Sequence, residues 1–155
     1  MDNWRKLQHL SWSEWASLAQ ALAMLPLTRL ALWLIGFRRW QSILARIAPI
    51  AENSAANRTT NSVRQARIAA RMVRIAAWYG PFRATCLTES LTLRWLLRRQ
   101  GIESDLRIGV RTEASRLEAH AWVEYCGLVL NDKDDVHQRF VAFDRALVPL
   151  DVELR

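Results

Sequence analysis

Cysteine is scarce in this sequence, and several common binding motifs are missing. Only Cys86 and Cys126 occur among 155 residues, so no disulfide framework is expected, and two cysteines 40 residues apart do not form a zinc finger. A Walker loop and a dinucleotide-binding glycine motif are also lacking. We therefore predict no metal and no cofactor. The first residues lack the apolar core of a secretion signal, so a reducing, cytoplasmic location is expected.

Lysine is almost absent, and acidic residues are rare in the first half of the chain. Lys6 and Lys133 are the two lysines, and the other positive charges are arginines. Residues 1–80 carry 11 basic and 3 acidic residues, whereas residues 81–155 carry 11 and 12, so the net charge of +7 arises in the first half. Such a surplus fits an acidic peptide, an anionic membrane surface or nucleic acid. It equally fits an ordinary solvated face.

Helical patterns dominate residues 1–60, which we interpret as an apolar helical hairpin preceding a core unit of residues 61–155. Ser11 and Glu14 form a capping box, which predicts a helix to about Leu25, and Pro26 fits the first turn of a second helix to about Ile47. The apolar stretch 21–37 is interrupted by Pro26, Thr28 and Arg29. Because a membrane-spanning helix needs about 20 apolar residues, we expect this hairpin to pack on the core, a partner or the membrane surface instead.

A third helix is predicted over about 62–78. It carries an apolar face and, beside that face, a stripe of arginines at helical spacing. Such a stripe can contact a substrate or a partner, and it can also be the solvated side of an amphipathic surface helix. The arginines are candidate binding residues: Arg64, Arg67, Arg71 and Arg74.

The stretch 85–101 predicts a helix that presents a cysteine. Thr85 is suited to the N-cap, and Gly101 stands where a helix-ending left-handed residue belongs. Cys86 would lie in the first turn, at the positive end of the helix dipole. That position favours the thiolate, which is the nucleophilic form of cysteine. Many inert cysteines share such a position, so a base and an orienting group are also needed. Cys126 has neither a helix terminus nor a histidine beside it, and we interpret it as structural or incidental.

Alternating residues after Gly101 predict an antiparallel sheet. We expect strands over 105–111, 119–125 and 128–131, a fourth over 140–143, and a polar loop over 112–117. Helices followed by such a sheet make an α+β fold.

His120 is the best candidate base among three histidines. His9 precedes the first helix cap and His137 falls in a charged segment expected to be a loop, whereas His120 begins a strand and shares a face with Trp122, a candidate substrate contact. A strand histidine can also be an ordinary polar residue.

Asp132 is the candidate orienting group, and it constrains the hairpin. A two-residue loop Cys126-Gly127 would place Asp132 on the wrong face. A three-residue loop including Tyr125, or an equivalent bulge, would pair His120 directly with Asp132. We therefore predict the odd-length loop or an equivalent bulge. Asp134 and Asp135 are alternative orienting groups.

These segments together resemble the leader peptidases of lasso-peptide biosynthesis, which are transglutaminase-like cysteine proteases of the papain-like superfamily. The resemblance covers about residues 78–135 and rests on Thr85-Cys86-Leu87, Ser90-Leu91, residues 96–102, residues 106–110, residues 119–124 and Asn131-Asp132. The apolar N-terminal helices also resemble those of the family's standalone form.

The resemblance implies that Cys86 is the nucleophile, His120 the base and then the acid, and Asp132 the orienting residue. It implies a ribosomally made precursor as substrate, cut between leader and core, with a separate leader-recognition protein and an ATP-dependent lasso cyclase as partners. Nucleic acid is not among these partners, whereas peripheral contact with a membrane is compatible with them. Two other interpretations stay open, namely acyl transfer to an amine and a non-catalytic basic module that binds membrane or peptide.

Overall fold

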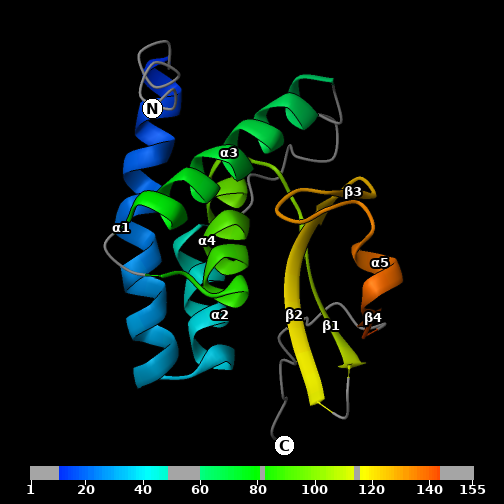
Figure 1. Cartoon of the computed structure of the whole chain (residues 1–155). Helices are drawn as coiled ribbons and strands as arrows, with labels where there is room; N and C mark the ends of the chain where they lie inside the picture. The colour runs from blue at the N-terminus through cyan, green and yellow to red at the C-terminus, as the bar shows by residue number, and fades with distance from the viewer. Residues whose placement is uncertain (1–10, 49–59, 81–82, 114–115, 144–155) are drawn as a thin grey trace, which may run out of the picture.

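The chain folds into helices followed by a small antiparallel sheet, as the predicted α+β class requires. The computed structural model describes residues 11–48, 60–80, 83–113 and 116–143. Within these residues, four helices precede the first strand and one short helix lies between the last two strands; Figure 1 shows their arrangement. In chain order the elements are α1 (Trp12–Leu34), α2 (Phe37–Ile47), α3 (Thr60–Tyr79), α4 (Cys86–Arg99), β1 (Asp105–Glu113), β2 (Arg116–Tyr125), β3 (Leu128–Val129), α5 (Val136–Arg139) and β4 (Val141–Ala142).

Helix α4 lies between the other helices and the sheet. It contacts α1, α2 and α3 on one side and β1 and β2 on the other (Figure 1). Its apolar side chains are almost fully buried, and they join the core residues of α1, α3 and β2 in one cluster. Small residues on the inner face of α3 let the helices approach closely. Those residues are Ala66, Ala69, Ala70 and Ala76. The position of α4, and of the residues it carries, is therefore fixed by packing on both sides of the helix.

The first helix starts as predicted but ends later. The backbone N–H of Ser11 donates to the Glu14 carboxylate at 2.8 Å, which confirms the capping box. The prediction that Pro26 starts a second helix is wrong, because α1 runs through Pro26 and ends at Leu34. Loss of one N–H does not break the helix where Leu25 and Thr28 on either side are buried. Gly36, with a φ of 78°, makes the break instead.

Because Pro26 does not interrupt it, α1 is long and apolar enough, by length and composition, to cross a membrane. One side of α1 packs against α3 and α4. The division into units of 1–60 and 61–155 stays a prediction.

The predicted third and fourth helices are both present. In α3 the four arginines of the predicted stripe are exposed, while Ala66, Ala70 and Val73 face the core. In α4 the Thr85 hydroxyl accepts the Thr88 N–H at 3.3 Å, which confirms the N-cap.

The sheet has the order β3-β2-β1-β4, with every neighbouring pair antiparallel. The long strands extend further than predicted, because Thr112 pairs with Leu117 and Glu113 with Arg116 inside the expected polar loop. In contrast, β3 contains only two of the four residues expected. The helix α5 was not predicted, and His137 lies in it rather than in a loop.

Candidate active site between a helix and the sheet

Cys86 is the first residue of α4, and a buried hydrogen bond fixes this helix against β2. Ser90 lies one helical turn after Cys86, so both residues are on the same side of the helix. The Ser90 hydroxyl donates to the backbone carbonyl of Ala121 at 3.0 Å. Ala121 directly follows His120 in β2. The side of α4 that carries Cys86 therefore faces the part of β2 that carries His120.

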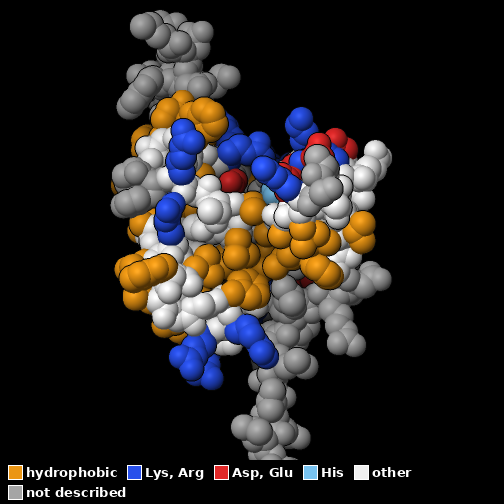
Figure 2. Space-filling model, turned by 60° about the horizontal axis from the view of Figure 1, so that its bottom comes forward, with side chains coloured by type: hydrophobic (Ala, Val, Ile, Leu, Met, Phe, Trp, Pro, Cys, Tyr) orange, Lys and Arg blue, Asp and Glu red, His pale blue; other side chains and the backbone are white. Residues whose placement is uncertain are grey.

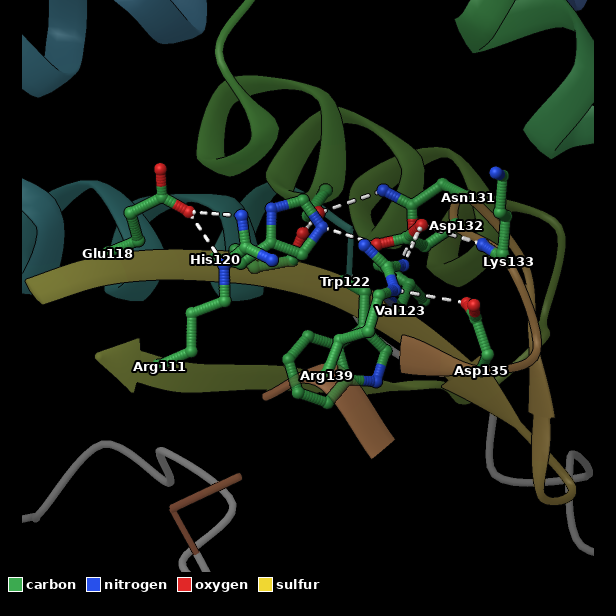
Figure 3. A network of polar contacts seen from close by, with 12 residues as sticks. Arg111, Glu118, His120, Trp122, Val123, Asn131, Asp132, Lys133, Asp135 and Arg139 are labelled. Carbon is green, nitrogen blue, oxygen red and sulfur yellow. Dashed lines mark hydrogen bonds and ion pairs between the residues drawn. The ribbon is translucent and has the colours of Figure 1, made fainter. Parts of the chain in front are cut away.

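His120 and Asp132 are in direct contact. The distance between His120 Nε2 and Asp132 Oδ2 is 2.5 Å, and Figure 3 shows the imidazole directed toward the carboxylate. The Phe140 ring stacks on the imidazole with centroids 4.9 Å apart. Both polar side chains are largely enclosed, with 26% and 16% of their surfaces exposed. A histidine held in this way has one fixed orientation.

The contact forms although the predicted loop is wrong. Tyr125 pairs with Leu128, so the hairpin has the two-residue loop Cys126-Gly127, not the three-residue loop. Both loop residues have positive φ, 50° and 77°, as the tightest hairpin turns require. A regular ladder in this register would place Asp132 on the wrong face.

Asn131 explains how Asp132 still reaches His120. The ladder ends where Leu130 N–H donates to the Val123 carbonyl at 2.9 Å. The Asn131 side chain then replaces the backbone, because its Oδ1 accepts the Val123 N–H at 2.8 Å and its Nδ2 donates to Ser90 at 2.9 Å. The chain leaves the sheet at this point, and Asp132 turns toward the imidazole. Asn131 thus joins the strand, the loop and α4.

Two further donors hold the Asp132 carboxylate. Its Oδ1 accepts the Lys133 backbone N–H at 2.7 Å and Arg139 Nη2 at 2.9 Å, which leaves Oδ2 for His120 (Figure 3). Burial by itself would raise the pKa of this carboxyl. The hydrogen bonds outweigh burial, so the pKa of Asp132 lies below its ordinary value of 3.8. Asp132 is the carboxylate that contacts the histidine, whereas Asp135 pairs with Arg139 at 3.0 Å.

A cavity of about 510 Å³ opens beside the first turn of α4. Burial raises the pKa of Glu89, one of its lining residues, above the ordinary 4.5. Arg74 opposes this rise and Asp132 adds to it. Of the striped arginines, Arg74 lines the cavity, and the other three do not belong to its lining. The cavity is lined by Arg74, Ala77, Trp78, Arg83, Ala84 and Glu89.

Trp122 does not fit its predicted role as a substrate contact, because its side chain is fully buried. Its indole N–H donates to Glu124 at 2.6 Å. Glu124 also pairs with His137 at 3.2 Å. Trp122 therefore belongs to the packing beneath the site.

Reasoning from the sequence did not identify Ser90, Asn131 and Arg139 as parts of the site. Asn131 beside Asp132, and Arg139 four residues after Asp135, were available signals. Within the described ranges, no group of three or more His, Cys, Asp or Glu side chains is placed to hold a metal ion.

The chain is similar to a known protein family and, over part of its length, to a curated protein. Residues 31–143 match the family described as the transglutaminase-like superfamily. Over 58 residues the chain is 38% identical to the microcin J25-processing protein McjB of Escherichia coli. That match covers 37% of this chain and 27% of McjB, so the two proteins align over about a quarter of the length of McjB. No solved structure matches the chain significantly.

Proposed function

This chain belongs to the transglutaminase-like superfamily, and from that premise we propose that it is a cysteine protease that removes the leader peptide from a ribosomally made lasso-peptide precursor. The predicted family resemblance is confirmed by the superfamily match and by the partial match to McjB. Members of this kind act as proteases or acyl transferases. The finer assignment rests on the chemistry of the site.

The observation that carries the proposal is the contact of His120 with Asp132 beside the helix that begins with Cys86. A cysteine nucleophile needs a neighbouring base and a group that orients the base. Because Nε2 of His120 is bound to Asp132, Nδ1 is the nitrogen left to exchange a proton with the Cys86 thiol. Asp132 then fixes the tautomer and stabilises the imidazolium.

The mechanism follows from these roles. The Cys86 thiolate attacks the scissile carbonyl, and the oxyanion accepts a hydrogen bond from an unpaired N–H at the start of α4. The His120 imidazolium protonates the leaving amine, which departs with the C-terminal part of the substrate. Water, deprotonated by His120, then hydrolyses the thioester and restores the thiol.

We further propose that the substrate is presented by other proteins in the cytoplasm. A separate leader-recognition protein holds the leader, and an ATP-dependent lasso cyclase closes the released core. The partial identity with a protein named for processing microcin J25 supports a role in peptide maturation. The cavity beside the first turn of α4 provides space for side chains next to the scissile bond.

Cleavage of a precursor peptide tests the proposal. The full chain is incubated with precursor and leader-binding protein, and products are identified by mass spectrometry. We expect Cys86→Ala to lower the rate by about 10³-fold or more. Cys126→Ala is the matched control, because this exposed thiol lies in the hairpin turn, and it should leave the rate unchanged. Undiminished cleavage by Cys86→Ala would refute the nucleophile, and an amide product in place of hydrolysed fragments would indicate acyl transfer.

A further inference from the structure

The outward side of α1 is apolar along its whole length. Exposed residues recur at intervals of three or four, which places them in one stripe along the helix. Trp12 is 90% and Trp33 is 81% exposed, so the two ends of this surface carry indole rings in solvent. The polar Ser13 and Gln20 lie outside the stripe. The stripe consists of Trp12, Ala16, Ala19, Ala23, Leu27, Leu30 and Leu34, flanked by Trp15, Leu22 and Trp33.

The opposite side of α1 is part of the core. Leu18, Ala21 and Leu25 are buried against α3 and α4. A cavity of about 400 Å³ opens on the outward side, lined by Pro26, Arg29, Leu30 and Trp33. A helix that is apolar all round is normally covered on all sides. The stripe is thus a surface built for contact with something apolar.

Positive charge predominates on the helices of the half of the molecule that carries the stripe. The described parts of α1, α2 and α3 contain eight arginines and a single acidic residue, Glu14. Arg29, Arg38, Arg39 and Arg46 are exposed on the first two helices. Figure 2 shows hydrophobic side chains along the left flank, where α1 lies in Figure 1, with Lys and Arg side chains among and below them. Such an apolar surface bordered by cations complements a layer of lipid tails under anionic headgroups.

We propose that this α1 face docks the protein on an anionic lipid membrane, with α1 lying in the plane of the interface. Indole rings favour the headgroup level, and arginines can bury their stems while their heads reach phosphates. A protein partner fits less well, because protein interfaces carry about one hydrogen bond per 100–200 Å² and the side chains of the stripe are aliphatic apart from the indole of Trp12. If α1 instead crossed the membrane, its buried side would lose its contacts with α3 and α4.

Vesicle sedimentation tests the proposal without any substrate, so its outcome is separate from that of the protease assay. The full chain is mixed with phosphatidylcholine vesicles or with vesicles that also contain phosphatidylglycerol. We expect binding to the anionic vesicles, weakening as salt is added. Leu30→Gln should lower the partition about tenfold. The matched control is Leu117→Gln, which changes an exposed leucine of β2 and should bind as the unchanged protein does.

Other results would overturn the proposal. These are absent or salt-independent binding to anionic vesicles, equal binding by Leu30→Gln, or equal loss in both variants. Self-association that Leu30→Gln abolishes would identify a second copy as the occupant. Binding of an acidic protein, with none to vesicles, would identify a protein partner. Alkaline carbonate should release the bound protein, and retention would indicate that α1 spans the bilayer. Circular dichroism of both variants checks that each is folded.

Discussion

At the scale of single residues, Arg139 is one of the hydrogen-bond donors that stabilise the charged form of the Asp132 carboxylate, beside the Lys133 backbone N–H and His120. It donates to Asp132 at 2.9 Å and is itself held by Asp135 at 3.0 Å. Because hydrogen bonds to the charged form lower the pKa of Asp132, Arg139→Gln should raise that pKa. We expect kcat/KM for precursor cleavage to fall about tenfold. The acidic limb of its pH profile should also move to higher pH.

The pH profile separates this positioning role from a merely structural one. Arg116→Gln, at the exposed far end of β2, is the control and should leave the profile in place. The contribution of Asp132 to the unfolding free energy should also be lost on acidification. Its folded pKa is depressed, so this contribution is present above pH 3.8 and is lost as the pH falls through the folded value. A reduced rate with an unmoved acidic limb would contradict the role of Arg139.

The pKa of Glu89 is shifted in the direction opposite to that of Asp132. Its pKa is raised, chiefly by burial, so its favourable contribution is present below pH 4.5 and is lost as the pH rises through the folded value. Glu89→Gln removes the ionising group and should raise the melting temperature at pH 7, with little difference below pH 4.5. Thermal unfolding followed by circular dichroism measures this. Glu103→Gln, at an exposed carboxylate, is the control, and an equal gain there would refute the explanation.

Residue chemistry determined which parts of the site could be predicted from the sequence. The chain has two cysteines and three histidines, so few combinations can supply a nucleophile and a base, and His120 and Asp132 do meet. Serine and asparagine are common and suit many positions. The position of Asn131 beside Asp132 marks it as a neighbour of the site, but the hydrogen bonds of Ser90 and Asn131 appear only when the strand and the helix are placed in space. The catalytic roles themselves stay predictions.

At the scale of elements, Ser90 connects α4 to β2. Ser90→Ala would leave the Ala121 carbonyl and the Asn131 amide without this buried partner. Loss of such a partner costs about 1–3 kcal/mol of unfolding free energy. Urea denaturation should show this loss, and the cleavage rate should also fall, because α4 presents Cys86.

The control for this prediction is Ser42→Ala. Ser42 donates to the Arg38 carbonyl at 3.1 Å within the exposed part of α2, and its loss should change stability by less than about 0.5 kcal/mol. Equal effects of the two substitutions would show that Ser90 does not hold the two elements together.

Helix and strand types could be predicted, whereas the ends of several elements could not. Periodicity locates α3, α4 and the long strands. The end of α1 depends on Gly36 rather than Pro26, because tertiary packing carries the helix through the proline. Likewise, the hairpin length depends on Cys126 adopting a positive φ, which a non-glycine residue rarely does. Tertiary packing and turn energetics determine where such elements end, and the local sequence alone does not reveal these end points.

At the scale of the whole molecule, charge is divided between the two halves of the fold. The ion pairs among the described residues all lie from Arg107 to Arg139, in the sheet, α5 and the loop between them. In contrast, the helices α1, α2 and α3 carry arginines with one acidic residue, Glu14, which attracts Arg64 and Arg71. Like charges on a compact body repel one another. We therefore expect added salt to raise the melting temperature by screening this repulsion.

Arg67 lets this expectation be tested at one position. It lies three residues after Arg64 and four before Arg71 on α3, and all three are exposed. Arg67→Glu turns two repulsive pairs into attractive ones, so the unfolding free energy at low salt should rise by about 0.5–1 kcal/mol. The gain should shrink toward 1 M salt, where the screening length is about 3 Å. Arg116→Glu is the control of opposite sign, since it adds an acid beside Glu113 and Glu118. Destabilisation by Arg67→Glu would show that Arg67 already makes a favourable interaction in the folded chain, and the stripe of arginines would then not be a purely repulsive surface.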